Sequence, residues 1–113
     1  MRTKAANHID SIFRACSDRT RLRILHLLSG GELCVCQMVE VLEVPPAKAS
    51  RHLAALRKAG LVVARKDAQW AYYRLAPAKG DFHRKLLQCL VSGFQEVPEL
   101  ARDAEKLKWC HCP

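Results

Sequence analysis

Residues 33–60 read LCVCQMVEVLEVPPAKASRHLAALRKAG and predict two helices joined by a short turn. We place the first helix at about 33–42 and the second from the prolines to Ala59, where Gly60 is suited to cap its end. Pro45-Pro46 make the turn, because proline is tolerated at the first position of a helix and not in its middle. The apolar residues of the first helix that we expect to face a core are Leu33, Met38, Val41 and Leu42.

Apolar spacing in the second helix separates an inward face from an outward one. Ala49, Leu53 and Leu56 are spaced i, i+4, i+7 and are expected to pack inward. A helix, a short turn and a second helix that starts with polar and basic residues are typical of a helix-turn-helix. The residues expected to contact DNA are Ala47, Lys48, Ser50 and Arg51 on the outward face, with His52 at its flank. In these roles Arg51 can pair bidentately with guanine and Ala47 can contact a thymine methyl group.

Two β-prone runs, 61–66 and 70–75, follow the second helix and are separated by the polar residues 67–69. This pattern predicts a hairpin, and a hairpin after a DNA-reading helix is a wing. We expect its aromatic residues to pack rather than to stack on bases, because strand alternation turns one face inward. The wing residues expected to position DNA phosphates are Arg65, Lys66 and Gln69.

Two further helices are expected before this unit, at 4–15 and at about 18–29, and Ser17-Asp18 can cap the second of them. A long helix is expected to begin near Gly80 or Asp81, and Pro98 interrupts or kinks its pattern. We expect His83 to be a solvent-exposed residue of this helix.

Together these elements predict a mainly α fold with a β-hairpin wing, that is, a winged helix-turn-helix of about five to six helices. We expect a homodimer formed through the first and last helices, because their apolar stripes have no evident partner within the chain. We expect residues 1–108 to form this DNA-binding and dimerisation domain. Residues 109–113 form a Cys-rich C-terminal tail, which we expect to be mobile.

The charge of the chain is concentrated in the predicted reading unit. Nineteen Lys and Arg residues against eleven Asp and Glu residues give a formal net charge of +8. Between Pro45 and Arg74, seven basic residues stand against one acidic residue, whereas the remainder of the chain is nearly neutral. A localised basic block favours a surface that faces a polyanion, and a solvated basic face without a partner is the alternative.

The composition limits the classes of protein to which this chain can belong. No apolar run approaches the roughly 20 residues that span a bilayer, and the N-terminus lacks the apolar core of a signal peptide, so we expect a cytoplasmic protein. In a reducing compartment, six cysteines indicate metal binding or redox sensing rather than a disulfide framework. We do not expect an enzyme, because no paired carboxylates, nucleophile–base set or phosphate loop is present.

Five motifs in order resemble those of the ArsR/SmtB family of winged-helix, metalloid-responsive repressors. The matching segments are 17–25, 32–36, 48–53, 56–62 and the wing 70–74. The string Glu32-Leu33-Cys34-Val35-Cys36 is similar to the arsenite-sensing (ArsR) type. The resemblance implies a homodimer bound to an inverted-repeat operator in double-stranded DNA. It also implies release of that DNA when arsenite or antimonite binds as inducer, with no cofactor required.

The chain departs from the family pattern in two places. A third cysteine often follows three positions after the second, and here that position is Val39. The family's other common metal site uses acidic and His ligands of the terminal helix. Asp81 and His83 match its first half, whereas Phe94 and Val97 stand where its second half is expected. We therefore do not expect a zinc site there.

Cys34 and Cys36 are the predicted ligands of a soft, thiophilic trivalent arsenic species. On an ideal helix, side chains at i and i+2 do not face each other, so we expect the first helical turn to unwind when both bind one ion. For a third sulfur, Cys110 and Cys112 are the first candidates, from the same subunit or its partner. A small exogenous thiol in their place, a separate tail site and a tail without function are the alternatives.

Other functions fit the same residues. A repressor of this fold could sense thiol oxidation, persulfides or a soft divalent metal through the same cysteines. From a different class, the chain could be a cytosolic protein that sequesters soft metals, with an incidental basic surface.

Overall fold

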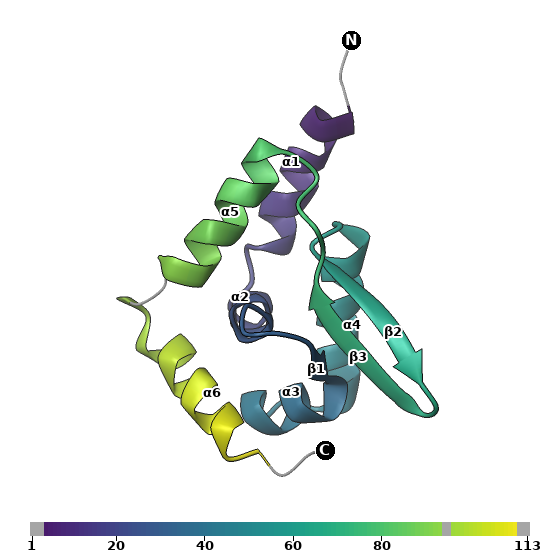
Figure 1. Cartoon of the computed structure of the whole chain (residues 1–113), viewed down its shortest axis with the longest axis vertical. Helices are drawn as coiled ribbons and strands as arrows, with labels where there is room; N and C mark the ends of the chain where they lie inside the picture. Colours follow the sequence, from purple (N-terminus) through teal and green to yellow (C-terminus); the bar gives the residue numbers. More distant parts are fainter. Residues whose placement is uncertain (1–3, 94–95, 111–113) are drawn as a thin grey trace.

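The computed structural model describes residues 4–93 and 96–110. Within these ranges the chain forms six helices and three strands, arranged as in Figure 1. In chain order the elements are α1 (Lys4–Ala15), α2 (Arg19–Leu28), β1 (Leu33–Cys34), α3 (Val35–Leu42), α4 (Pro46–Lys58), β2 (Val62–Asp67), β3 (Trp70–Leu75), α5 (Asp81–Ser92) and α6 (Pro98–Lys108). The winged helix-turn-helix predicted from the sequence is confirmed, with α3 and α4 as its two helices and β2–β3 as its wing.

The ends of α4 follow the predicted signals. Pro46 occupies the first helical position, where the missing N–H costs nothing. At the other end, Gly60 has φ +79° and donates its N–H to the carbonyl of Arg57 at 3.0 Å. The N–H of Leu61 reaches the carbonyl of Leu56 at 3.0 Å, which completes a Schellman motif. The chain is thereby turned directly from α4 into the wing.

The core lies where α2, α3 and α4 meet the base of the wing. Ala49, Leu53 and Leu56 on α4 are fully buried, as their spacing predicts. The largest side chains buried with them are Ile24, Leu25, Met38 and Leu61. This packing fixes which face of α4 is left outward, and hence which residues can contact DNA.

The sheet has three strands in the order β1-β3-β2, one more than the predicted hairpin. The prediction that the helix begins at Leu33 is wrong, because Leu33 and Cys34 form β1, which pairs antiparallel with Tyr73 and Tyr72 of β3. The edge of β3 supplies the backbone hydrogen bonds that make these two residues a strand. Because this contact joins distant segments, the periodicity of the sequence does not reveal it. The helix itself begins at Val35.

The turn of the wing is shorter than predicted. Asp67 pairs with Trp70, so the loop is the two residues Ala68 and Gln69 rather than 67–69. Ala68 has φ +57°, and a positive φ at the first loop residue is typical of the primed turns that two-residue hairpin loops favour.

The segment after Pro98 is a separate helix, α6, that packs on α2 and α3. Arg23 of α2 donates two hydrogen bonds to the carboxylate of Asp103, at 2.8 and 2.9 Å, and Asp103 is only 2% exposed. Helix α6 therefore has a partner within the chain. The helix that lies beside α1 is α5, and Figure 1 shows these two running together at one end of the molecule.

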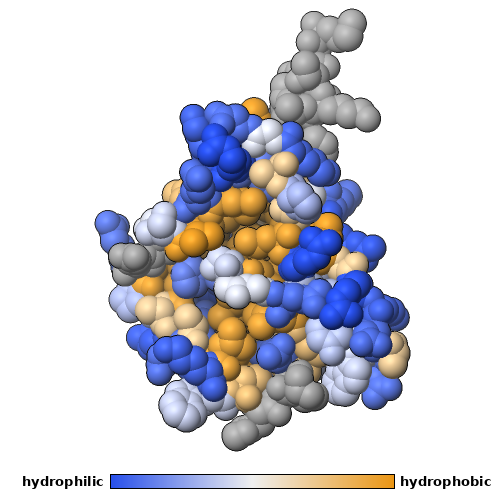
Figure 2. Space-filling model, viewed as in Figure 1, coloured by the Kyte–Doolittle hydropathy of each residue, from blue (hydrophilic) through white to orange (hydrophobic). Residues whose placement is uncertain are grey.

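Apolar residues of α1 and α5 remain open to solvent. The rings of Phe13 and Phe82 lie 5.7 Å apart, yet Phe13 is 56% exposed and Phe82 38%. Ile9 on α1 and Val91 on α5 are exposed as well. Figure 2 shows apolar side chains gathered across the middle of the viewed face, with hydrophilic residues around them.

His83 is buried, at 5% exposure, so the prediction of a solvent-exposed residue is wrong. It stands in the first turn of α5, and its Nδ1 accepts a hydrogen bond from the backbone N–H of Lys79 at 3.2 Å. The imidazole ring thus packs against the loop that precedes its own helix. Helical periodicity does not reveal this contact. In the described part of the chain, no helix is long and apolar enough to cross a membrane.

Candidate thiol site and nucleic-acid interface

The two thiols of the Cys-x-Cys motif lie together. The Cys36 thiol donates to the sulfur of Cys34, and the two Sγ atoms are 3.1 Å apart. Cys34 is the last residue of β1, whereas Cys36 lies in the first turn of α3. The helical i, i+2 geometry therefore does not apply, and the expectation that a helical turn must unwind before both sulfurs meet loses its basis.

A change of backbone conformation between the two residues brings the sulfurs together. Cys34 has extended dihedrals, φ −75° and ψ 148°, and serves as the N-cap residue of α3. Its N–H donates to Oε1 of Gln37 at 2.8 Å, which satisfies one backbone donor at this junction. Cys34 is 2% exposed, and Cys36 is half-buried. The pair can thus offer two adjacent sulfurs from a protected position.

The structure describes three further cysteines, Cys16, Cys89 and Cys110. Among residues 4–93 and 96–110, no three His, Cys, Asp or Glu side chains are grouped as a metal site. Cys110 is half-buried and packs against the core beyond the end of α6. Burial raises the pKa of Cys16, with Arg21 opposing, and Cys89 is exposed on α5. Cys112, the second candidate in the tail, lies outside the described residues.

The candidate DNA-reading residues of α4 share one exposed face. Ala47, Lys48, Ser50 and Arg51 are all exposed, while Ala49, Leu53 and Leu56 on the other face of the helix are buried in the core. On the wing, Lys66 and Gln69 are exposed in the same way. A basic, exposed helix start beside an exposed basic hairpin is the arrangement in which a helix enters the major groove and a wing follows the backbone.

His52 differs from the other predicted DNA contacts. It is half-buried, and its Nδ1 accepts a hydrogen bond from Nε of Arg21 at 3.1 Å. Burial lowers the pKa of His52; Asp18 opposes this effect, and Arg21 adds to it. A neutral ring with Nδ1 as acceptor fits that environment. His52 therefore joins α4 to α2 within the protein.

Arg65 also has an intramolecular partner. Its Nε and Nη2 donate to the two carboxylate oxygens of Glu32 at 2.9 and 2.7 Å. The guanidinium carbon lies 4.5 Å from the centre of the Tyr72 ring. Hydrogen bonding from Arg65 holds the pKa of Glu32 below its usual range. The sequence prediction that Arg65 faces phosphates did not anticipate this pair, because Glu32 and Arg65 are distant in sequence and meet only through β1.

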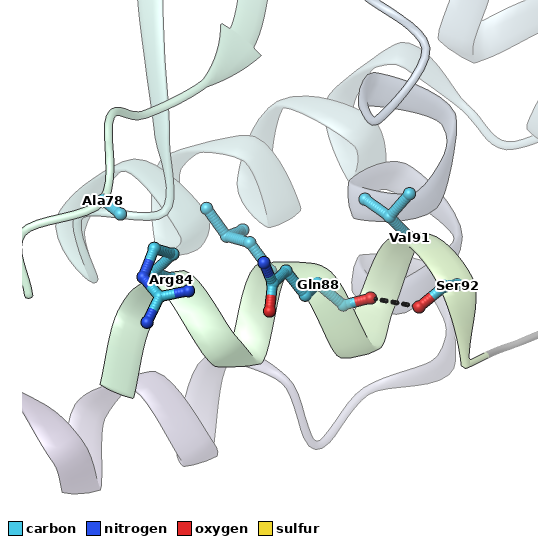
Figure 3. Close-up of a pocket in the computed structure, with 6 residues that line it drawn as sticks. Ala78, Arg84, Gln88, Val91 and Ser92 are labelled. Carbon is cyan, nitrogen blue, oxygen red and sulfur yellow. Dashed lines mark hydrogen bonds between the residues drawn. The ribbon is translucent and has the colours of Figure 1, made fainter. Parts of the chain in front are cut away.

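A shallow pocket runs along α5, as Figure 3 shows. It is lined by Ala78, Arg84, Leu87, Gln88, Val91 and Ser92. Ser92 donates its hydroxyl to the carbonyl of Gln88 at 2.8 Å, and none of these residues belongs to the thiol pair or the basic face. The pocket is therefore a separate feature of α5 and the loop before it.

Fold and surface together define a winged helix-turn-helix DNA-binding protein. The family model described as "Bacterial regulatory protein, arsR family" matches residues 18–63, from the cap of α2 into β2. The chain is 41% identical over 97 residues to an arsenic resistance transcriptional regulator of Pseudomonas putida, covering 83% of this chain and 76% of that protein. The chain belongs to the ArsR family of transcriptional regulators, a family of DNA-binding proteins and not of enzymes.

Further relatives and solved structures agree with this assignment. The arsenical resistance operon repressor of Escherichia coli is 49% identical over 67 residues, which cover 58% of this chain and 57% of that protein. HlyU from Vibrio cholerae superposes with a TM-score of 0.68 at 31% identity, covering 79% of this chain and 94% of that one. A homodimeric winged helix-turn-helix domain from Mycobacterium bovis gives a TM-score of 0.65 at 28% identity, covering 80% and 84%.

Proposed function

We propose that this regulator is a repressor that leaves its operator when trivalent arsenic or antimony binds Cys34 and Cys36. The observation that carries the proposal is the 3.1 Å separation of the two sulfurs at the start of the helix-turn-helix. Thiolates are the ligands that select soft ions. Two relatives named for arsenic resistance, from Pseudomonas putida and Escherichia coli, support arsenic as the signal.

The chemistry of capture balances without an oxidant. Each thiol forms an As–S bond and displaces one hydroxide from arsenous acid, and the thiol proton leaves with that hydroxide as water. Two such steps hold one arsenic between β1 and α3. A third position on arsenite remains, and Cys110 or Cys112 of either subunit is proposed to fill it.

The DNA-bound form is proposed to be a homodimer. Ile9 and Phe13 lie one turn apart on α1, and Phe82 of α5 lies against Phe13, so these exposed residues form an apolar surface that a second copy can cover. The solved relative described as homodimeric supports this assembly. A two-fold dimer presents two α4 helices, which suits an inverted-repeat operator.

The test is arsenite-driven release from an inverted-repeat duplex, followed by fluorescence anisotropy under excess reductant. We expect the wild type and the matched control Cys89→Ser to release DNA. Cys34→Ser and Cys36→Ser should bind the duplex and remain bound to it when arsenite is added, because a single thiol cannot chelate the ion. Release by both single variants would overturn the thiol assignment.

The alternatives give different outcomes in the same assay. Release that needs an oxidant and fails under excess reductant would identify a redox sensor. Release by cadmium or zinc but not by arsenite would identify a sensor of soft divalent metals. Equal affinity for random DNA and for the inverted repeat would favour a metal-sequestering protein.

A further inference from the structure

A row of side chains crosses all three strands from the thiol site to the wing. Cys34 of β1 is paired with Tyr72 of β3, and Tyr72 is paired with Arg65 of β2. Directly opposed residues of antiparallel strands share one face of the sheet. Glu32, two residues before Cys34, closes the row by its double hydrogen bond to Arg65.

We infer that this row makes the wing a second output of the thiol site, in addition to α4. The inference rests on the proposed binding of arsenic at Cys34 and Cys36. In it, Glu32, Tyr72 and Arg65 are positioning residues that transmit a movement of β1 to the hairpin. They do not touch the ion.

The contacts explain why the movement would be transmitted. β1 is only two residues long, so its position depends on the pairing with β3 and on the side chains at its ends. The guanidinium of Arg65 is fixed in two ways, by the planar double hydrogen bond to Glu32 and by the Tyr72 ring beneath it. Such a fork is geometrically demanding, so a displacement of Glu32 requires Arg65 and its strand to follow or the pair to break.

Ion capture acts at the start of this row. Bonds from one arsenic to both sulfurs fix Cys34 relative to Cys36, and they replace the present thiol–thiol contact at the junction of β1 and α3. A shift of Cys34 reaches Tyr72 through the backbone ladder and Arg65 through Glu32. Because Lys66 neighbours Arg65 on β2, the exposed basic side of the wing then changes its position relative to α4.

The first experiment reads the wing without DNA. The chain has two tryptophans, and Trp70 begins the second strand of the wing, so Trp109→Phe leaves Trp70 as a reporter. Arsenite should change the Trp70 emission in this background. Glu32→Gln should remove most of the change, while the ultraviolet absorbance of the As–S bonds still shows arsenite binding. Glu105→Gln is the matched control, since Glu105 pairs with Lys108 on α6, away from the sheet.

The second experiment measures coupling as the ratio of operator dissociation constants with and without arsenite. Glu32→Gln should reduce this ratio by about 5-fold, within the range found for residues that couple two sites. Arg65→Gln should reduce the ratio similarly, and the double variant should add little, because the two residues act as one pair.

Three outcomes are distinguishable. The inference would be overturned, and the proposed function left intact, if Glu32→Gln had the coupling ratio of the wild type and if arsenite changed its Trp70 emission as much as it does without this substitution. Weaker operator binding by Arg65→Gln without arsenite, with normal coupling, would also overturn it and make Arg65 a phosphate contact. Absence of As–S absorbance in the wild type would instead refute the proposed function.

Discussion

The sulfur atoms of Cys34 and Cys36 lie 3.1 Å apart because one residue ends a strand and the other belongs to a helix. The hydrogen bond from the Cys34 N–H to Gln37 fixes the junction at which the backbone changes from extended to helical. The thiol pair is thus formed before any ion binds. Its geometry depends on β1, and therefore on the wing strand with which β1 pairs.

We predict that arsenite binds without loss of helix. Because both sulfurs already face each other, α3 keeps its first turn when an ion joins them. The far-ultraviolet circular dichroism of the DNA-free protein should be the same with and without saturating arsenite. Cys34→Ser treated in the same way provides the control. A decrease of helical signal seen only in the wild type would show that α3 unwinds after all.

Arg51→Ala should weaken operator binding by about 1–3 kcal/mol, the usual cost of losing a bidentate contact to guanine. Arg51 is exposed on the outward face of α4, between core residues that hold the helix in place. Fluorescence anisotropy across a salt titration measures the change. Arg102→Ala, an exposed arginine on α6, is the control. Equal affinities of Arg51→Ala and the wild type at every salt concentration would contradict the assignment of α4 as the reading helix.

The double variant Cys110→Ser/Cys112→Ser separates two classes of arsenical. Arsenite has three positions for sulfur, so loss of a tail ligand should raise the arsenite concentration needed to release DNA. A monomethylated trivalent arsenical has two such positions, which Cys34 and Cys36 fill, and its midpoint should not change. If both midpoints equal those of the wild type, the tail is not the source of the third sulfur.

Features set by local chemistry were predictable from the sequence. Asp18 accepts hydrogen bonds from the backbone of Thr20 and Arg21 and starts α2, and Gly60 adopts the left-handed conformation that ends α4. The inward spacing of Ala49, Leu53 and Leu56 fixed the exposed face of the reading helix. Each of these signals acts over a few residues, so the sequence alone contains it.

Features set by contacts between distant segments were not predictable. Leu33 and Cys34 continue an apolar helical pattern in sequence, and only the free edge of β3 makes them a strand. Glu32 and Arg65 are separated by the whole helix-turn-helix, so nothing local indicated their pairing. No local feature of the sequence indicated that Asp103 is buried, because its partner, Arg23, lies on α2.

The pair between Arg23 and Asp103 should contribute to the stability of the fold. Among the described residues, Asp103→Ala leaves the nearly buried guanidinium of Arg23 with one ion-pair partner, the carboxylate of Glu99 at 3.9 Å. We expect a loss of about 3 kcal/mol in the free energy of unfolding, at the lower end of the cost of breaking a buried pair. Urea denaturation measures it. Asp81→Ala, whose exposed carboxylate pairs with Lys85, should cost less than about 1 kcal/mol. Equal losses in the two variants would contradict the structural role of the α2–α6 pair.

The stability of the protein should decrease when the pH falls below about 6.5, the ordinary pKa of histidine. Burial, and secondarily the charge of Lys79, lowers the pKa of His83 in the folded state. The unfolded chain therefore binds more protons below that pH, and the free energy of unfolding falls until the pH passes the lowered pKa of the folded state.

His83→Gln keeps an acceptor for the Lys79 N–H but cannot be protonated, so its stability should depend less on pH in this window. Burial also lowers the pKa of His52, so the variant should retain part of the slope, and His52→Gln should remove the other part. Urea denaturation at a series of pH values measures both, and a slope in His83→Gln as steep as in the wild type would show that the imidazole of His83 is not the group responsible.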